Sequence, residues 1–158
     1  MKIQIRDVLS LSGRDYVVEG LVYYQVAGKT TVLARAVDDA QVVWIESPSS
    51  DLGGRNTEAA TAAMDRLLVL HEIKDLDLSL PPPESISYHG ISYVLRLAGR
   101  AAIEIRGAVP ERAAGTAQLW RYRTAGDQIL QIEEGTGRLF MLAGQAVLRG
   151  MIDHFPER

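Results

Sequence analysis

The stretch from Tyr16 to Val26 constrains the fold of this chain more than any other part of the sequence. Its residues alternate between two sets, and the second set contains the polar residues Glu19 and Gln25. Because successive side chains on a β-strand point to opposite sides, the pattern predicts a strand with one face packed against a core. The apolar or small residues of that face are Tyr16, Val18, Gly20, Val22, Tyr24 and Val26.

The opening of this stretch recurs in the second half of the chain. Gly-x-x-Tyr-Val-Val at residues 13–18 returns as Gly-x-x-Tyr-Val-Leu at residues 90–95. Each unit also closes on an Ile–Glu pair, which ends at Glu46 in the first and at Glu133 in the second. Counted from the tyrosine, the spans are 30 and 40 residues, and the difference fits a longer loop over 107–116. Since insertions are accommodated in loops between strands, we expect two related β units.

Each unit is expected to be a meander of short strands. In the first, strands over 16–26, 30–37 and 41–46 are separated by turn residues at 27–29 and 38–39. The second is expected to contain strands over 90–97, 101–105, 119–123 and 128–133, with a turn at Ala98–Gly99, a loop over 107–116 and a hairpin turn at 124–127.

These patterns predict an all-β, mainly antiparallel fold. Two tandem units, residues 1–80 and 81–158, would pack as a sandwich or partly open barrel, most simply within one compact domain. At most one or two short helical segments are expected, and Thr57 is a candidate N-cap for an alanine-rich helix over 57–64. The remaining expectations are extended chain over 67–80, a proline connector at 81–83, and an extended tail over 138–155 that contains a short turn.

Composition excludes several classes of function. The net charge is −3 and the sequence contains no basic run, which argues against nucleic-acid binding because that relies on lysines and arginines to neutralise phosphates. No stretch approaches the roughly 20 apolar residues that a transmembrane helix needs, and the N-terminal residues do not resemble a signal peptide. We therefore expect a soluble, cytoplasmic protein.

Catalytic motifs are missing from the sequence. There is no cysteine, and the three histidines, His71, His89 and His154, stand far apart and outside metal-binding spacings. Neither the G-x-S-x-G motif of hydrolases nor a phosphate-binding P-loop is present. We therefore expect a non-enzymatic protein without a metal ion or cofactor.

Aromatic and acidic residues in the predicted strands are the best candidates for a binding site. Aromatic faces and carboxylates both attract cations, so a pocket of this kind would suit a polyamine. The alternative is that the aromatic residues are simply core. The candidate residues are Trp44, Glu46, Trp120, Tyr122 and Glu133.

A further set of motifs runs through the chain: Gly13-x-x-Tyr16-x-Val18-x-Gly20, Trp44-Ile45-Glu46, Gly90-x-x-Tyr93, Ala101, Trp120-x-Tyr122, Ile132-Glu133, Gly144 and Phe155-Pro156. In these motifs the sequence resembles a bacterial family, the domain of unknown function 4178, over about residues 7 to 156. The resemblance suggests an accessory or scaffolding role in envelope stress, because such domains are encoded beside small membrane proteins, aminopropyltransferase-like proteins and phage-shock-type proteins. It implies a protein partner at the membrane surface, and a homodimer would cover open sheet edges. It transfers no catalytic residue.

Overall fold

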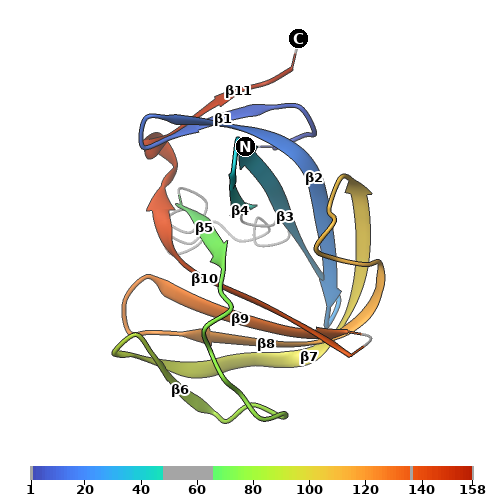
Figure 1. Ribbon diagram of the computed structural model, residues 1–158, viewed down its shortest axis with the longest axis vertical. Helices are drawn as coiled ribbons and strands as arrows, with labels where there is room; N and C mark the ends of the chain where they lie inside the picture. The colour runs from blue at the N-terminus through green and yellow to red at the C-terminus, as the bar shows by residue number, and fades with distance from the viewer. Residues whose placement is uncertain (1, 48–65, 136, 158) are drawn as a thin grey trace.

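The computed structural model describes residues 2–47, 66–135 and 137–157, and this part of the chain is almost entirely β-structure (Figure 1). One 3₁₀ turn, Arg149–Met151, interrupts the strands near the C-terminus. No helix in the described residues is long and apolar enough to cross a membrane. The strands are β1 (Val8–Leu11), β2 (Arg14–Val26), β3 (Lys29–Asp38), β4 (Gln41–Ser47), β5 (Arg66–Glu72), β6 (Ser85–Tyr88), β7 (Ile91–Gly107), β8 (Gly115–Arg123), β9 (Gln128–Gly135), β10 (Arg138–Leu148) and β11 (Ile152–Phe155).

Eight of these strands form a closed antiparallel barrel in the order β2-β3-β4-β5-β10-β9-β8-β7. The ladder between β2 and β7 closes it, from Gly20 opposite Gly107 to Gln25 opposite Ala102. In Figure 1, β1 and β11 extend the sheet above the barrel, and β6 extends it below.

The all-β, antiparallel expectation is confirmed, but the expected sandwich or partly open barrel is wrong because the barrel is closed. Closure depends on the length of β2 and β7. The first part of β2 pairs with β1, and the first part of β7 pairs with β6. Farther along, β2 and β7 pair with each other. A bulge in each, between Val18 and Gly20 and between Leu95 and Leu97, permits the bend that this requires.

The expected turn at Ala98–Gly99 is also wrong, because β7 runs through it without interruption. Ala98 lies opposite Trp120 and Gly99 opposite Leu119 in the ladder with β8. A glycine in the sequence predicts a turn, but within a barrel strand it can also mark a bend or the close approach of another segment. A Cβ at Gly99 would lie 3.4 Å from a Val26 methyl.

The segment between β5 and β6 is extended, as expected, and packs against the outside of the barrel. It descends from β5 to β6 in Figure 1. Ile73, Leu76 and Leu78 contact a cluster on the outer face of β7–β10. The helix expected over 57–64 lies outside the described residues. The tail follows its expectation, with β10, the 3₁₀ turn and β11 in succession.

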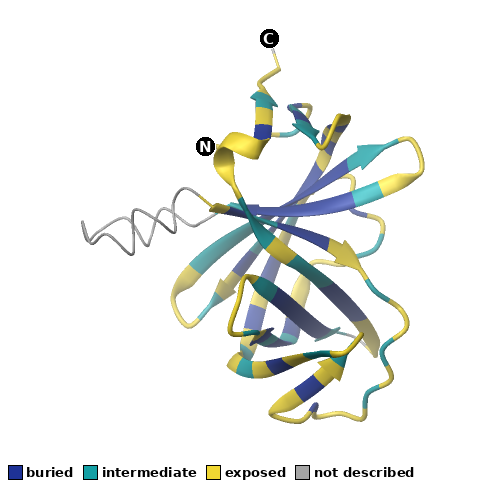
Figure 2. Ribbon diagram, turned by 90° about the vertical axis from the view of Figure 1, so that its left-hand side faces the viewer, coloured by how far each residue is buried: buried dark blue, intermediate teal, exposed yellow. Residues whose placement is uncertain are grey.

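Three hydrophobic clusters hold the molecule together, and their buried residues run along the strands in Figure 2. The first fills the barrel and includes Val22, Trp44 and Phe140. The second lies beneath β1 and β11, and the third lies beneath the segment that follows β5. Burial of this kind stabilises a fold by roughly 25 cal/mol per Å² of apolar surface removed from water.

Candidate functional site

The loop between β7 and β8 enters one mouth of the barrel. Val109 is buried in the interior cluster, and the Ala108 amide donates a hydrogen bond to the Glu19 carbonyl, 2.9 Å away. Two glycines make room for this docking. A Cβ at Gly20 would lie 2.5 Å from the Ala108 carbonyl oxygen, and one at Gly107 would lie 2.5 Å from the Glu19 carbonyl oxygen.

The docked loop places Glu111 against the buried Arg35 of β3. The Arg35 Nε donates to both Glu111 carboxylate oxygens, at 2.6 and 2.8 Å. The Arg35 Nη1 also lies 3.4 Å from Glu19 Oε2. Only 10% of the Arg35 side chain is exposed, so these two carboxylates compensate a guanidinium that would otherwise be buried alone.

The next residue of the loop, Arg112, binds a carboxylate inside the barrel. It contacts both oxygens of Glu133 and the Tyr24 hydroxyl. Tyr24 Oη and Gln131 Nε2 donate to the same carboxylate at 3.0 and 3.1 Å. The guanidinium also lies 4.5 Å from the centre of the Phe140 ring, where cation–π attraction adds to the ion pair.

Burial dominates the electrostatics of this network. It raises the pKa of Glu133 above its ordinary value, although Arg112 and the hydrogen bonds from Gln131 and Tyr24 favour the ionised form. It also raises the pKa of Tyr24 well above 10.0, and the Glu133 charge acts in the same direction. Tyr24 is therefore a protonated donor at physiological pH.

A pocket of about 900 Å³ lies at this mouth, between the loop and β5, β9 and β10. Glu111, Arg112 and Glu133 contribute its paired charges. Its other charged lining residues have no ion pair within the described residues. They are Glu72, Lys74 and Arg138, all exposed.

The barrel interior contains a second ion pair. Arg121 Nη2 lies 2.7 Å from Glu46 Oε2, and both side chains are largely buried. The Arg121 Nε has no hydrogen-bond partner in the described structure. Nearby, burial and the charge of Arg121 lower the pKa of Arg123.

The five residues selected from the sequence do not share a pocket. Trp44, Glu46 and Glu133 belong to strands β4 and β9 and face the barrel interior, where Trp44 packs edge-on against Phe140 with ring centres 5.3 Å apart. The other two contribute to the cluster on the outer face of the barrel, and the Tyr122 hydroxyl donates to the Pro83 carbonyl at 2.7 Å. They are Trp120 and Tyr122.

Sequence reasoning missed the loop residues Glu111 and Arg112 and their partners Arg35 and Tyr24. Two signals in the sequence pointed to Tyr24 and to the two loop residues. Tyr24 stands on the apolar face of its strand, and the second unit is longer than the first in the very loop that contains Glu111 and Arg112. Among the described residues, no group of three His, Cys, Asp or Glu side chains is placed to hold a metal ion.

A sequence model of the family described as Domain of unknown function (DUF4178) matches residues 4–149. The chain belongs to this family. The DUF4178 match covers all eight barrel strands and the mouth loop, and it ends before β11. The resemblance seen in the sequence is thereby confirmed. Comparison with curated proteins and with solved structures gave no match.

Proposed function

We propose that this DUF4178 chain is a non-enzymatic barrel module that binds a small carboxylate-bearing molecule at the mouth beside the β7–β8 loop. The pocket of about 900 Å³ carries this proposal. Its inner charged residues are held in ion pairs, whereas Lys74 and Arg138 at its rim have no ion pair within the described residues. The mouth of a β-barrel is a common position for a ligand site. The volume also lies in the range of small-molecule pockets.

The state of Glu133 favours binding over catalysis. A general acid or base must reach the reacting atom of a substrate. Glu133 is 2% exposed, and Arg112, Tyr24 and Gln131 all donate to its carboxylate. A substrate would have to displace these donors first, so the residue is suited to fixing the loop in the mouth.

Charge at the rim favours an anionic ligand. Among the described lining residues, two cations without an ion pair, Lys74 and Arg138, stand against one unpaired carboxylate, Glu72, in the count of charges. The carboxylates that would attract a polyamine, Glu46 and Glu133, are each bound by an arginine. A ligand carboxylate would pair with the rim cations through charge-assisted hydrogen bonds.

Calorimetric titration with succinate, citrate, glutamate and spermidine tests this proposal. A carboxylate should bind, and Lys74→Gln combined with Arg138→Gln should weaken binding about tenfold or more because hydrogen bonds to charged groups are lost. The matched control is Lys29→Gln with Arg100→Gln, which removes two exposed cations outside this pocket. Absence of carboxylate binding, or equal loss in both double variants, would reject the site. Binding of spermidine alone would favour the polyamine alternative.

A protein partner is the second candidate function, and an exposed apolar stripe supports it. Val17, Val8 and Phe155 are direct neighbours across β2, β1 and β11. Val17 is 43% exposed and Phe155 is 55% exposed. Adjacent exposed apolar side chains are typical of contact surfaces. An accessory module of an envelope-stress system would use such a surface.

Co-purification from cells tests the partner. Val17→Lys with Phe155→Lys should release a protein that the wild type retains. Val94→Lys is the control, because Val94 is equally exposed at 43% but lies on β7, away from the stripe. A partner that remains on the double variant, or the recovery of none with the wild type, would count against this role.

We also infer that the two halves descend from one duplicated unit. The hairpin registers support this, since Tyr16 opposes Leu9 as Tyr93 opposes Ile86. In both halves, the bulge begins two residues after the tyrosine. Glu46 and Glu133 then occupy matching places, opposite Leu33 and Leu119.

A further inference from the structure

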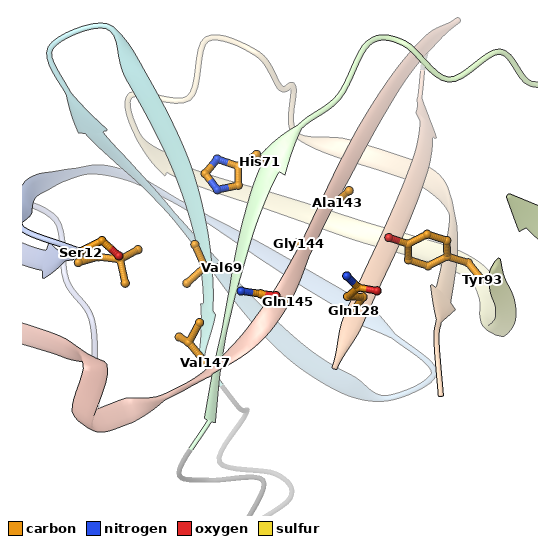
Figure 3. A pocket seen from close by; sticks show the side chains of 10 residues that line it. Ser12, Val69, His71, Tyr93, Gln128, Ala143, Gly144, Gln145 and Val147 are labelled. Atoms are coloured by element: carbon orange, nitrogen blue, oxygen red, sulfur yellow. The ribbon is translucent and has the colours of Figure 1, made fainter. Parts of the chain in front are cut away.

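A second pocket, of about 380 Å³, lies on the outer face of the barrel, apart from the mouth (Figure 3). Its base is the ladder between β5 and β10. The β1–β2 turn contributes Ser12 on one side, and Tyr93 of β7 and Gln128 of β9 stand on the other side. Five segments of the chain, from the β1–β2 turn, β5, β7, β9 and β10, thus converge on one site.

One part of the base of this pocket is apolar. Val69 and Val147 supply methyl groups, and the ladder places Val69 opposite Gln145. Gly144 keeps the two strands close, because a Cβ there would lie 1.9 Å from the Val69 carbonyl oxygen. The valine side chains therefore form a fixed surface that can accept the apolar side of a ligand.

The pocket also presents hydrogen-bonding groups with unused capacity, and two of them, His71 and Gln145, stand on the base itself. Within the described residues, no hydrogen bond engages the side chains of Ser12, His71, Tyr93, Gln128 or Gln145. Tyr93 is only 3% exposed, and its hydroxyl points toward Gln128 in Figure 3. A buried ring that presents a free hydroxyl to a pocket offers a fixed donor and acceptor at low entropic cost.

We propose that this pocket binds an uncharged, hydroxyl-rich ring of the carbohydrate class. The amides of Gln128 and Gln145 and the Tyr93 hydroxyl each offer a hydrogen bond to a ligand hydroxyl. The apolar part of the base, Val69 and Val147, would pack against the C–H face of the ring. A phosphorylated or carboxylated ligand is disfavoured, because no lysine or arginine lines the described pocket to pair with its charge.

NMR titration of the ¹⁵N-labelled protein tests the site. The probes are glucose, galactose, N-acetylglucosamine and maltose, with glucose 6-phosphate and glucuronate as charged counterparts. At least one neutral sugar should shift the amide signals around Val69, Gln128 and Gly144. Tyr93→Phe keeps the buried ring and removes only the hydroxyl. This change and Gln128→Leu should each weaken binding about fivefold to tenfold, the usual effect of one lost hydrogen bond.

Variants of the two pockets separate this site from the mouth. Lys74→Gln with Arg138→Gln should leave sugar binding unchanged, since both residues line the other pocket. The proposal is overturned if no neutral sugar shifts these signals at millimolar concentration. It is also overturned if Tyr93→Phe and Gln128→Leu bind as the wild type does, or if a charged counterpart binds more tightly.

Discussion

Charged side chains inside the barrel are held in pairs, and this governs which of them can act. Glu133 meets Arg112, Glu46 meets Arg121, and Arg35 meets Glu111. Such pairs add little net stability compared with a well-packed apolar core, but breaking one leaves a buried charge without compensation. The pairs therefore make the interior sensitive to single substitutions.

Arg112→Leu should destabilise the protein by about 3–5 kcal/mol at neutral pH, because the buried Glu133 carboxylate would lose its ion-pair partner. The loss should be smaller in acid, where the isolated carboxyl can take up a proton. Urea denaturation at neutral and acidic pH measures both effects. Arg6→Leu is the control, since its pair with Glu157 is exposed and worth at most about 1 kcal/mol. Equal losses of unfolding free energy in Arg112→Leu and Arg6→Leu would contradict the buried ion pair between Arg112 and Glu133.

Gly144→Ala should cost about 3 kcal/mol or more, because the added Cβ would lie 1.9 Å from the Val69 carbonyl oxygen and force β5 and β10 apart. Gly150→Ala is the matched control, with no atom within 4 Å of the added Cβ. Thermal unfolding of the two variants compares them directly. A Gly144→Ala melting temperature close to that of Gly150→Ala would show that the strands do not approach as described.

At the scale of elements, Asp7 joins the two ends of the described chain. Its carboxylate accepts hydrogen bonds from the Gln4 amide at 2.8 Å and the Glu157 amide at 3.1 Å. His154 Nε2 of β11 lies 2.7 Å from the same carboxylate. This buried contact supports the pairing of β1 with β11 beside the apolar stripe.

The Asp7 contact predicts a pH-dependent contribution to stability. Burial raises the pKa of Asp7, but the hydrogen bonds from His154 and the two backbone amides outweigh it and hold the pKa below 3.8. A lowered folded pKa stabilises the protein at pH values above 3.8, and this benefit disappears as the pH falls through the folded pKa. The gap in unfolding free energy between wild type and Asp7→Asn should therefore shrink in acid. If the difference in unfolding free energy stays constant or widens in acid, the Asp7 contact does not contribute in this way.

Local patterns in the sequence predicted most strands, because alternation and glycine turns act between near neighbours. The meander over 16–46 and the hairpin at 124–127 appear in the structure close to their expected bounds. Gly99 misled the prediction, since a strand glycine and a turn glycine look alike without knowledge of the neighbouring strand. The sequence likewise did not predict that the 107–116 loop enters the mouth of the barrel, because this docking depends on contacts with distant residues such as Gly20.

At the scale of the whole molecule, closure decides where the candidate site forms. The ladders β2–β7 and β5–β10 both join the first half of the chain to the second. No local pattern specifies such pairings, so the sequence left sandwich and barrel unresolved. Alternation of side chains along each strand divides the five selected residues between the interior and the outer face. Trp120 and Trp44 are thereby separated, although each lies in a well-predicted strand.

Nuclear Overhauser effects between β2 and β7 test the closed barrel most directly, because the mouth pocket exists only if these strands pair. The account predicts cross-strand contacts in antiparallel register, from Gly20 with Gly107 to Gln25 with Ala102. It also predicts slow exchange of the amides that bond across this ladder. Contacts within each half but none between β2 and β7, with fast exchange of both strands, would indicate an open sheet and contradict the account.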